Sequence, residues 1–98
     1  MVQKLDLNAI FHALSHDARR DMLARLSEED LTVGELAEPL EMSLAAAAKH
    51  LKVLEATGLV RKTVVGRRHV CRLHARSLAI ASAWLRYYER FWERRRDA

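Results

Sequence analysis

The sequence contains few of the residues that cross-link a chain or carry it through a membrane. Its only cysteine, Cys71, cannot form an internal disulfide, and one cysteine with scattered histidines does not provide the ligand spacing of a zinc site. The first ten residues lack the apolar run of a secretion signal, and no stretch approaches the roughly 18 apolar residues of a membrane span. We therefore expect a cytoplasmic protein that uses no metal and no other cofactor.

Enzyme signatures are also missing. The sequence has no glycine-rich phosphate loop, no nucleophile motif and no pair of carboxylates placed as an acid and a base, so we do not expect an enzyme. We expect a single domain over residues 1–98, and a domain of this length has a modest core. An apolar helix face left outside that core is expected to pack on a second copy of the chain.

Charge is distributed unevenly along the chain. Residues 49–76 contain eight basic side chains and one acidic side chain, whereas residues 1–48 contain nine acidic and four basic ones. A basic block of this kind is typical of a protein that binds a polyanion. A solvated charged surface is the alternative, but the block overlaps a motif that is itself typical of DNA-binding proteins.

The clearest start of a helix is at Thr32. Thr32 and Glu35 have the spacing of a capping box, in which each side chain accepts a hydrogen bond from the other residue's backbone N–H. Pro39 keeps this helix short, because a proline within a helix removes a backbone donor and crowds the preceding turn. Ser43 is then the expected N-cap of the next helix, which we place at residues 44–57.

This next helix completes a helix-turn-helix at about residues 33–57. Four apolar residues are spaced so that they share its inward face: Leu44, Ala47, Leu51 and Leu54. Gly58 is expected to end it in a left-handed conformation. The second helix of such a motif normally lies in the major groove of DNA.

A β-hairpin is predicted after the helix-turn-helix, at about residues 59–74. β-Branched residues alternate on both sides of Gly66, which supplies the turn, and Arg67 and Arg68 lie at the tip. A helix-turn-helix followed by a hairpin is a winged helix. We therefore predict a mainly α fold with a β-hairpin, a winged helix-turn-helix of about five helices and a two-stranded wing.

Apolar spacing predicts three further helices, at residues 5–14, 16–27 and about 76–95. Ser15 is the expected N-cap of the second of them. Three arginines are predicted on the outward side of that helix: Arg19, Arg20 and Arg25.

The expected partner is double-stranded DNA. Alanines at the start of a recognition helix let it lie deep in the groove, where their methyl groups contact thymine methyls. Basic side chains there reach guanine or phosphate, and arginines on the wing contact the minor groove or the backbone. The predicted DNA-binding residues are Ser43, Ala45, Ala46, Lys49, His50, Lys52, Arg67 and Arg68. For Ala48, a DNA contact and simple helix propensity explain the residue equally well.

The first and last helices carry more apolar surface than a short domain needs, so we predict a homodimer built through them. A twofold dimer would place two recognition helices about 34 Å apart on a palindromic site. The predicted interface residues are Leu7, Ile10, Phe11, Leu14, Leu78, Ala81, Trp84, Leu85, Tyr88 and Phe91.

The sequence resembles the ArsR/SmtB family of winged-helix repressors over about residues 6–92. Three segments carry the resemblance: LSHDARRDMLARL, LTVGELAEPLEMS and KHLKVLEATGLVRKTVVGRRH. The resemblance implies a dimer formed through the first and last helices. It also implies promoter binding that blocks transcription, and many members release the promoter when a metal or another inducer binds.

The chain departs from the metal-sensing members of that family. Thr32 and Gly34 occupy the region where arsenic sensors have paired cysteines, and the last helix has no histidine after His74. Dithiol sensors need two cysteines, and only Cys71 is present. Ala48 replaces the serine that is usual in the recognition helix. The resemblance is therefore to metal-independent members, and the sequence identifies no small-molecule or metal inducer.

These observations predict a dimeric, sequence-specific transcriptional regulator that represses or autorepresses from a palindromic promoter site. Two alternatives remain. One is a winged-helix module whose basic face binds an acidic protein. The other is a redox-responsive repressor that acts through Cys71, since nearby arginines could favour a thiolate.

Overall fold

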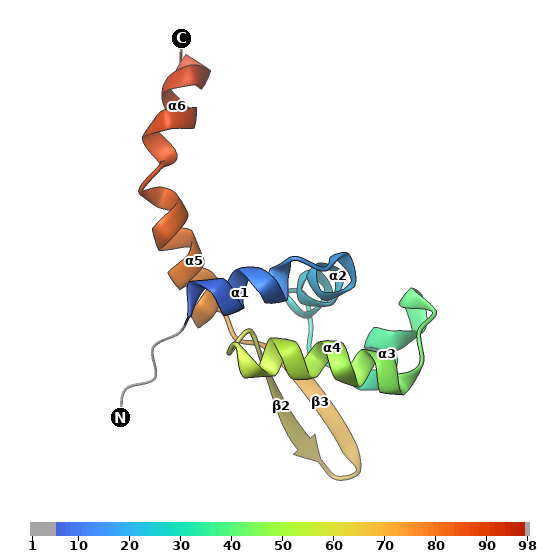
Figure 1. The fold of residues 1–98 in the computed structure, drawn as a ribbon. Coiled ribbons are helices and arrows are strands. Elements are labelled where there is room, and N and C mark those ends of the chain that lie inside the picture. The colour runs from blue at the N-terminus through green and yellow to red at the C-terminus, as the bar shows by residue number, and fades with distance from the viewer. Residues whose placement is uncertain (1–5, 98) are drawn as a thin grey trace, which may run out of the picture.

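The structure is a computed structural model that describes residues 6–97, with side chains described through residue 93 (Figure 1). The helices and strands follow in the order α1 (Leu7–Leu14), α2 (Asp17–Leu26), β1 (Leu31–Thr32), α3 (Val33–Ala37), the 3₁₀ turn η1 (Glu38–Leu40), α4 (Leu44–Ala56), β2 (Val60–Val65), β3 (Arg68–Leu73), α5 (Arg76–Arg86) and α6 (Glu89–Asp97). The predicted fold class is confirmed, because a helix-turn-helix is followed by a β-hairpin. Within the described range, no helix has the length and hydropathy that crossing a bilayer requires.

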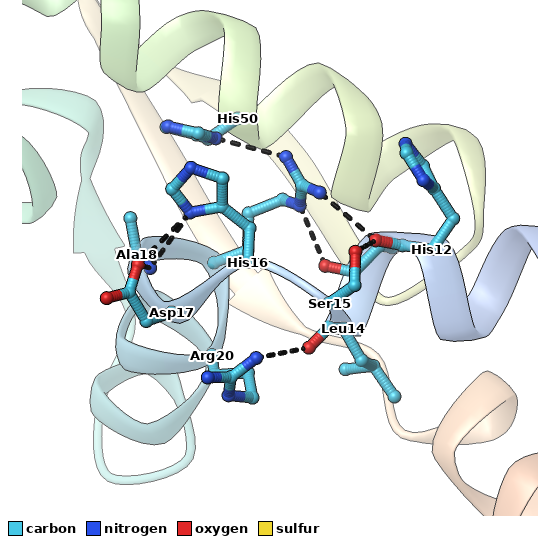
Figure 2. Close-up of polar contacts among 10 residues, drawn as sticks. His12, Leu14, Ser15, His16, Asp17, Ala18, Arg20 and His50 are labelled. Atoms are coloured by element: carbon cyan, nitrogen blue, oxygen red, sulfur yellow. Dashed lines mark hydrogen bonds and ion pairs between the residues drawn. The ribbon is translucent and has the colours of Figure 1, made fainter.

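The first two helices meet at a short corner. Asp6 caps α1 by accepting a hydrogen bond from the backbone N–H of Asn8 at 2.9 Å, and Leu5, the predicted first residue, lies outside the described range. The N-cap of α2 is His16, whose Nδ1 accepts from the N–H of Ala18 at 3.2 Å (Figure 2). The prediction of Ser15 as this cap was wrong. Ser15 ends α1 instead, because its hydroxyl turns back and donates to the preceding helix.

The capping box that begins α3 is confirmed. The hydroxyl of Thr32 accepts from the N–H of Glu35 at 3.2 Å, and a carboxylate oxygen of Glu35 accepts from the N–H of Thr32 at 2.8 Å. Pro39 lies in η1, directly after the five residues of α3. Glu41 then adopts a positive φ of 53°, and the chain turns into α4.

Both predicted ends of α4 are confirmed. The hydroxyl of Ser43 accepts from the N–H of Ala46 at 3.1 Å. Gly58 has a φ of +73°, which an L-residue adopts only at a cost, and the N–H of Leu59 bonds to the carbonyl of Leu54 at 2.9 Å. This closure satisfies a carbonyl at the helix end and starts the chain into β2.

The wing belongs to a three-stranded antiparallel sheet of order β1-β3-β2. Val65 pairs with Arg68, so Gly66 and Arg67 form a two-residue turn, and Gly66 has the positive φ of 64° that this turn needs. The prediction of a two-stranded wing omitted β1. Two residues are too few to show an alternating pattern, and Thr32 is at once the end of this strand and the cap of α3.

The core lies between α1, α2, α3, α4 and the sheet. Its buried members are small or aliphatic: Ala13, Met22, Leu23, Leu26, Leu36, Ala37, Ala47, Leu51, Leu54, Leu59, Val60 and Cys71. Among the described side chains, no phenylalanine, tyrosine or tryptophan belongs to this buried cluster. Arg19 is buried as well, which contradicts its predicted outward position. Its side chain turns inward because it hydrogen-bonds to carbonyls at the end of α1.

The predicted single helix over residues 76–95 is divided into α5 and α6. The N–H groups of Tyr87, Tyr88 and Phe91 bond to carbonyls three residues earlier, which tightens the turn and redirects the chain. Figure 1 shows the two helices running away from the body as an arm. The radius of gyration is 15.5 Å, whereas a compact domain of this size has about 13 Å. The arm therefore extends beyond the compact part of the fold.

Candidate nucleic-acid interface

The exposed side of α4 carries the residues that we predicted to contact DNA. Ala45, Lys49 and Lys52 are exposed, and Ala46 is half-buried. The opposite side is fixed in the core by buried residues, of which Leu51 and Leu54 are fully enclosed. The helix is therefore anchored along one face and leaves the other for a partner.

Leu44 does not have the inward position that its spacing predicted. Its side chain is 62% exposed at the first turn of α4, beside the N-cap Ser43. Three other predicted members of the inward face are buried: Ala47, Leu51 and Leu54. In the first turn of a helix, the burial of a side chain depends on which other elements pack around that turn, and the spacing of apolar residues does not show this. Leu44 therefore adds a large apolar side chain to the outer surface.

A shallow groove joins the start of α4 to the start of α3 and to the wing. It is lined by Thr32, Val33, Gly34, Glu35, Leu44, Ala48, Arg67, Arg68 and His69. The predicted tip residues Arg67 and Arg68 thus lie on the same surface as the first turn of the recognition helix. The groove brings together apolar side chains from α4 and cations from the wing.

Arg68 also has an acidic neighbour. One of its guanidinium nitrogens lies 3.9 Å from a carboxylate oxygen of Glu35, and both side chains are largely exposed, so this ion pair contributes little stability. Hydrogen bonds from Thr32 lower the pKa of Glu35, with smaller contributions from the charges of Arg68 and Arg25. Glu35 is therefore ionised at neutral pH and holds the capping box together.

The basic block divides into paired and unpaired cations. Lys62 lies 3.7 Å from Glu55, and Arg72 lies 3.0 Å from Asp30, so both are partly neutralised within the chain. Lys49, Lys52 and Arg67 form no ion pair among the residues that the structure describes. Within the described part of the chain, three unpaired cations of the block therefore lie on α4 and at the turn of the wing, whereas the equally unpaired Arg61 and Arg76 lie on β2 and α5.

His50 lies at the inner edge of the exposed face of α4. Its ring is half-buried, and its Nδ1 is 3.2 Å from a guanidinium nitrogen of Arg19 on α2. The ring also packs beside that of His16, with ring centroids 4.5 Å apart and planes tilted by 57°, and Figure 2 shows the two rings next to each other. Of the predicted DNA-binding residues on α4, His50 is the one held by another helix.

The predicted dimer residues fall into three groups by burial. Ile10 and Ala81 are buried within the chain. Leu7, Phe11, Leu14 and Leu78 are half-buried. Trp84, Leu85, Tyr88 and Phe91 are exposed on the arm, together with Tyr87 and Trp92, which the predicted set omitted. Phe11 of α1 packs edge-on against Trp84 with centroids 5.7 Å apart, so α1 and the arm form one continuous apolar surface.

Cys71 has the environment of a packing residue. Its side chain is fully buried in the core, and burial raises the pKa of its thiol, with a smaller opposing effect from Lys62. A reactive cysteine is accessible and has a lowered pKa, so these features give the redox alternative no support. Among the described residues, no three histidine, cysteine or carboxylate side chains are grouped as metal ligands.

Known proteins share this sequence pattern and this fold. A family model described as a helix-turn-helix domain matches residues 14–63. The HTH-type transcriptional regulator Rv2034 of Mycobacterium tuberculosis is 39% identical over 84 residues, which cover 86% of this chain and 76% of that protein.

Solved structures extend this likeness to the three-dimensional fold. The ArsR family transcriptional regulator RHA00566 is 38% identical, with a TM-score of 0.81, covering 95% of this chain and 97% of the other. The homodimeric winged helix-turn-helix domain of Mb0332 from Mycobacterium bovis has a TM-score of 0.70 at 24% identity, covering 85% of this chain and 77% of the other. At that identity it shows the fold alone. Taken with the helix-turn-helix match, Rv2034 and RHA00566 show that the chain belongs to the ArsR family of transcriptional regulators and has its winged helix-turn-helix DNA-binding domain.

Proposed function

We propose that this protein is a cytoplasmic homodimer that binds a palindromic promoter site and represses transcription. The observation that carries the DNA-binding part is the position of its unpaired cations. Lys49 and Lys52 project from the exposed side of α4, and Arg67 lies at the turn of the wing. Cations without an internal partner remain available to phosphate and to guanine.

We assign different roles to the two parts of this surface. The first turn of α4 presents Leu44, Ala45 and the half-buried Ala48 to base edges, where apolar groups contact thymine methyls. Ser43 and the first N–H groups of α4 suit a phosphate oxygen. Arg67 and Arg68 add contacts to the adjacent backbone, which increase affinity without specifying sequence.

The dimer is supported by the exposed apolar arm. Six large side chains of α5 and α6 are between 38% and 66% exposed: Trp84, Leu85, Tyr87, Tyr88, Phe91 and Trp92. An isolated soluble domain rarely leaves such a continuous apolar surface in water. A twofold dimer through this arm and α1 would bring two copies of α4 to one palindrome.

The binding experiment uses a DNA duplex selected from a random pool by the purified protein, titrated at several salt concentrations. The logarithm of the affinity is expected to fall linearly with the logarithm of salt, by about 0.9 per phosphate neutralised. Arg67→Ala should lower this slope by about one and weaken binding to all duplexes alike. Lys49→Ala should weaken the selected duplex more than an unrelated one.

Lys62→Ala is the matched control. It also removes one cation, but this cation is already paired with Glu55. It should leave the salt slope close to that of the wild type. An unchanged slope in Arg67→Ala, or no selected sequence at all, would contradict the proposed interface. Repression is tested with a reporter placed behind a promoter that contains the selected site, and increased expression would contradict it.

A further inference from the structure

The guanidinium of Arg19 connects three helices. The side chain starts on α2 and is 7% exposed. Its Nε donates to the carbonyl of Ala13 at 2.7 Å, and its Nη2 donates to the carbonyl of His12 at 3.1 Å. Its Nη1 lies 3.2 Å from Nδ1 of His50 on α4. One buried side chain therefore contacts the last turn of α1 and the middle of the recognition helix.

The contact with His50 requires one form of the imidazole. A guanidinium has only N–H donors, so Nδ1 of His50 must be the acceptor and its proton must be on Nε2. The ring is therefore neutral in this arrangement. Burial lowers the pKa of His50, and the neighbouring His16 and Arg19 lower it further, while Asp17 acts in the opposite direction. The neutral form is accordingly the stable one at neutral pH.

The geometry of the Arg19 side chain can fix the orientation of α4 relative to α1. The carbonyls of His12 and Ala13 lie at the C-terminal end of α1, where a cation complements the helix dipole. The guanidinium is planar and its donors point in fixed directions, so three contacts on one plane limit rotation between the groups that they join. The orientation of α4 relative to α1 is therefore constrained by this side chain.

We infer that the contact between Arg19 and His50 positions the recognition helix for binding to two half-sites at once. The inference rests on the proposed function, in which α1 belongs to the dimer interface and α4 lies in the major groove. Each recognition helix is then held at a fixed place relative to the twofold axis. His50 acts in this way as a positioning residue, and the exposed Lys49 and Lys52 contact the DNA.

The consequence differs between one half-site and two. A loosened α4 can still fit a single half-site, because one helix can adjust to one groove. Two half-sites about 34 Å apart must be occupied simultaneously. Binding of the second half-site adds affinity only if both recognition helices already have the correct spacing and orientation. Loss of the Arg19–His50 contact should therefore lower affinity for the full palindrome selectively.

The test compares His50→Leu, which removes the acceptor, with His50→Asn, whose side-chain oxygen can take the place of Nδ1. Each variant is titrated against the selected palindrome and against a duplex that contains one half-site. We expect His50→Leu to lose about tenfold in affinity for the palindrome and less than about twofold for the half-site. His50→Asn should stay within about threefold of the wild type on both duplexes. His12→Ala, which removes an exposed histidine ring from α1, is the control and should change neither affinity.

Each other outcome decides against a specific idea. An equal loss on both duplexes would show that His50 contacts DNA directly, and no loss on either would show that the link is dispensable; both overturn the inference. Arg19→Lys provides a second route if His50→Leu does not fold, because a lysine offers one point charge and cannot keep three directed contacts. It should show the same selective loss on the palindrome. A wild-type protein that binds both duplexes equally would instead overturn the proposed dimeric function.

Discussion

Cations of the same type have different surroundings in this protein. Lys62 and Arg72 are engaged by Glu55 and Asp30, whereas Lys49 and Arg67 have no charged partner among the described residues. The sequence showed the basic block but not this division, because each ion pair joins two different segments of the fold: Glu55 of α4 pairs with Lys62 of β2, and Asp30 lies far from Arg72 in the chain. Asp30 and Arg72, for example, are 42 positions apart. The proposed interface is therefore smaller than the basic block.

Leu44 gives a prediction at the level of a single methyl group. Its exposed side chain at the first turn of α4 lies beside Ala48 in the groove. If it contacts a thymine methyl, replacing that thymine by deoxyuridine should lower wild-type affinity by about 1 kcal/mol, the value of one buried methyl or methylene group. The same replacement should have no effect on Leu44→Ala. The measurement is a titration of both proteins with both duplexes.

The control is Val64→Ala, which shortens a side chain that is 64% exposed on the wing and does not line the groove. It should remain as sensitive to deoxyuridine as the wild type. A Leu44→Ala protein that loses as much affinity on deoxyuridine as the wild type would exclude a contact between Leu44 and the methyl group.

Cys71 gives a prediction about pH. Its thiol pKa is raised by burial, so the folded state holds the proton more tightly than the unfolded state does. The sign follows from linkage: this contribution to stability is complete below the unfolded pKa of about 8.5 and is lost as pH rises through the raised folded pKa. The free energy of unfolding in urea should therefore decline above about pH 8.5 more steeply in the wild type than in Cys71→Ala.

The same burial should protect the thiol from reagents. Iodoacetamide should modify Cys71 at pH 8 only when urea unfolds the protein, because the native side chain has no exposed surface. Rapid modification of the native protein would contradict the packing role and restore the redox alternative.

At the level of elements, the sequence predicted those features that local chemistry decides. The capping box of Thr32 and Glu35 and the left-handed Gly58 depend on a few adjacent residues, and each was confirmed. The sequence did not predict the break near Tyr87, since no proline or glycine marks it. The buried position of Arg19 was also missed, because it depends on carbonyls of another helix. The proposed DNA-binding and dimer residues remain predictions.

Gly58 allows a test of how much the glycine at the end of α4 contributes to stability. An alanine there would keep the positive φ of 73°, and its Cβ would lie 3.1 Å from the hydroxyl of Ser77, which is buried and donates to the carbonyl of Thr57. We expect Gly58→Ala to lower the free energy of unfolding by about 2 kcal/mol, from backbone strain and crowding together. Urea unfolding measures this value.

Gly66→Ala is the matched control, because Gly66 also has a positive φ but a Cβ there would meet nothing within 4 Å. Gly66→Ala should lower the free energy of unfolding by about 1 kcal/mol, which is the contribution of backbone strain alone. A Gly58→Ala protein as stable as Gly66→Ala would show that Ser77 moves aside at no cost.

At the scale of the whole molecule, the aromatic residues are concentrated on the side away from the core. The chain has six phenylalanine, tyrosine and tryptophan residues, and five of them lie between residues 84 and 92. The sixth, Phe11, packs against Trp84. A small domain that needed these rings for its own stability would enclose them, whereas here the described core consists of smaller side chains. The arm therefore has the composition of an interface core.

The dimer itself gives the last prediction. Trp84→Ala combined with Phe91→Ala removes two rings that are 44% and 57% exposed. The double variant should lower the folding stability of the single chain only slightly and weaken the dimer strongly. Sedimentation at micromolar concentration should show two 11.3 kDa chains together in the wild type and one in the variant.

Val64→Ala combined with Val65→Ala removes exposed apolar groups from the wing instead and should leave the dimer intact. The variant without the two rings should still bind a half-site but lose its preference for the palindrome, because only the dimer links two recognition helices. A dimer that persists without Trp84 and Phe91 would place the interface elsewhere on the molecule.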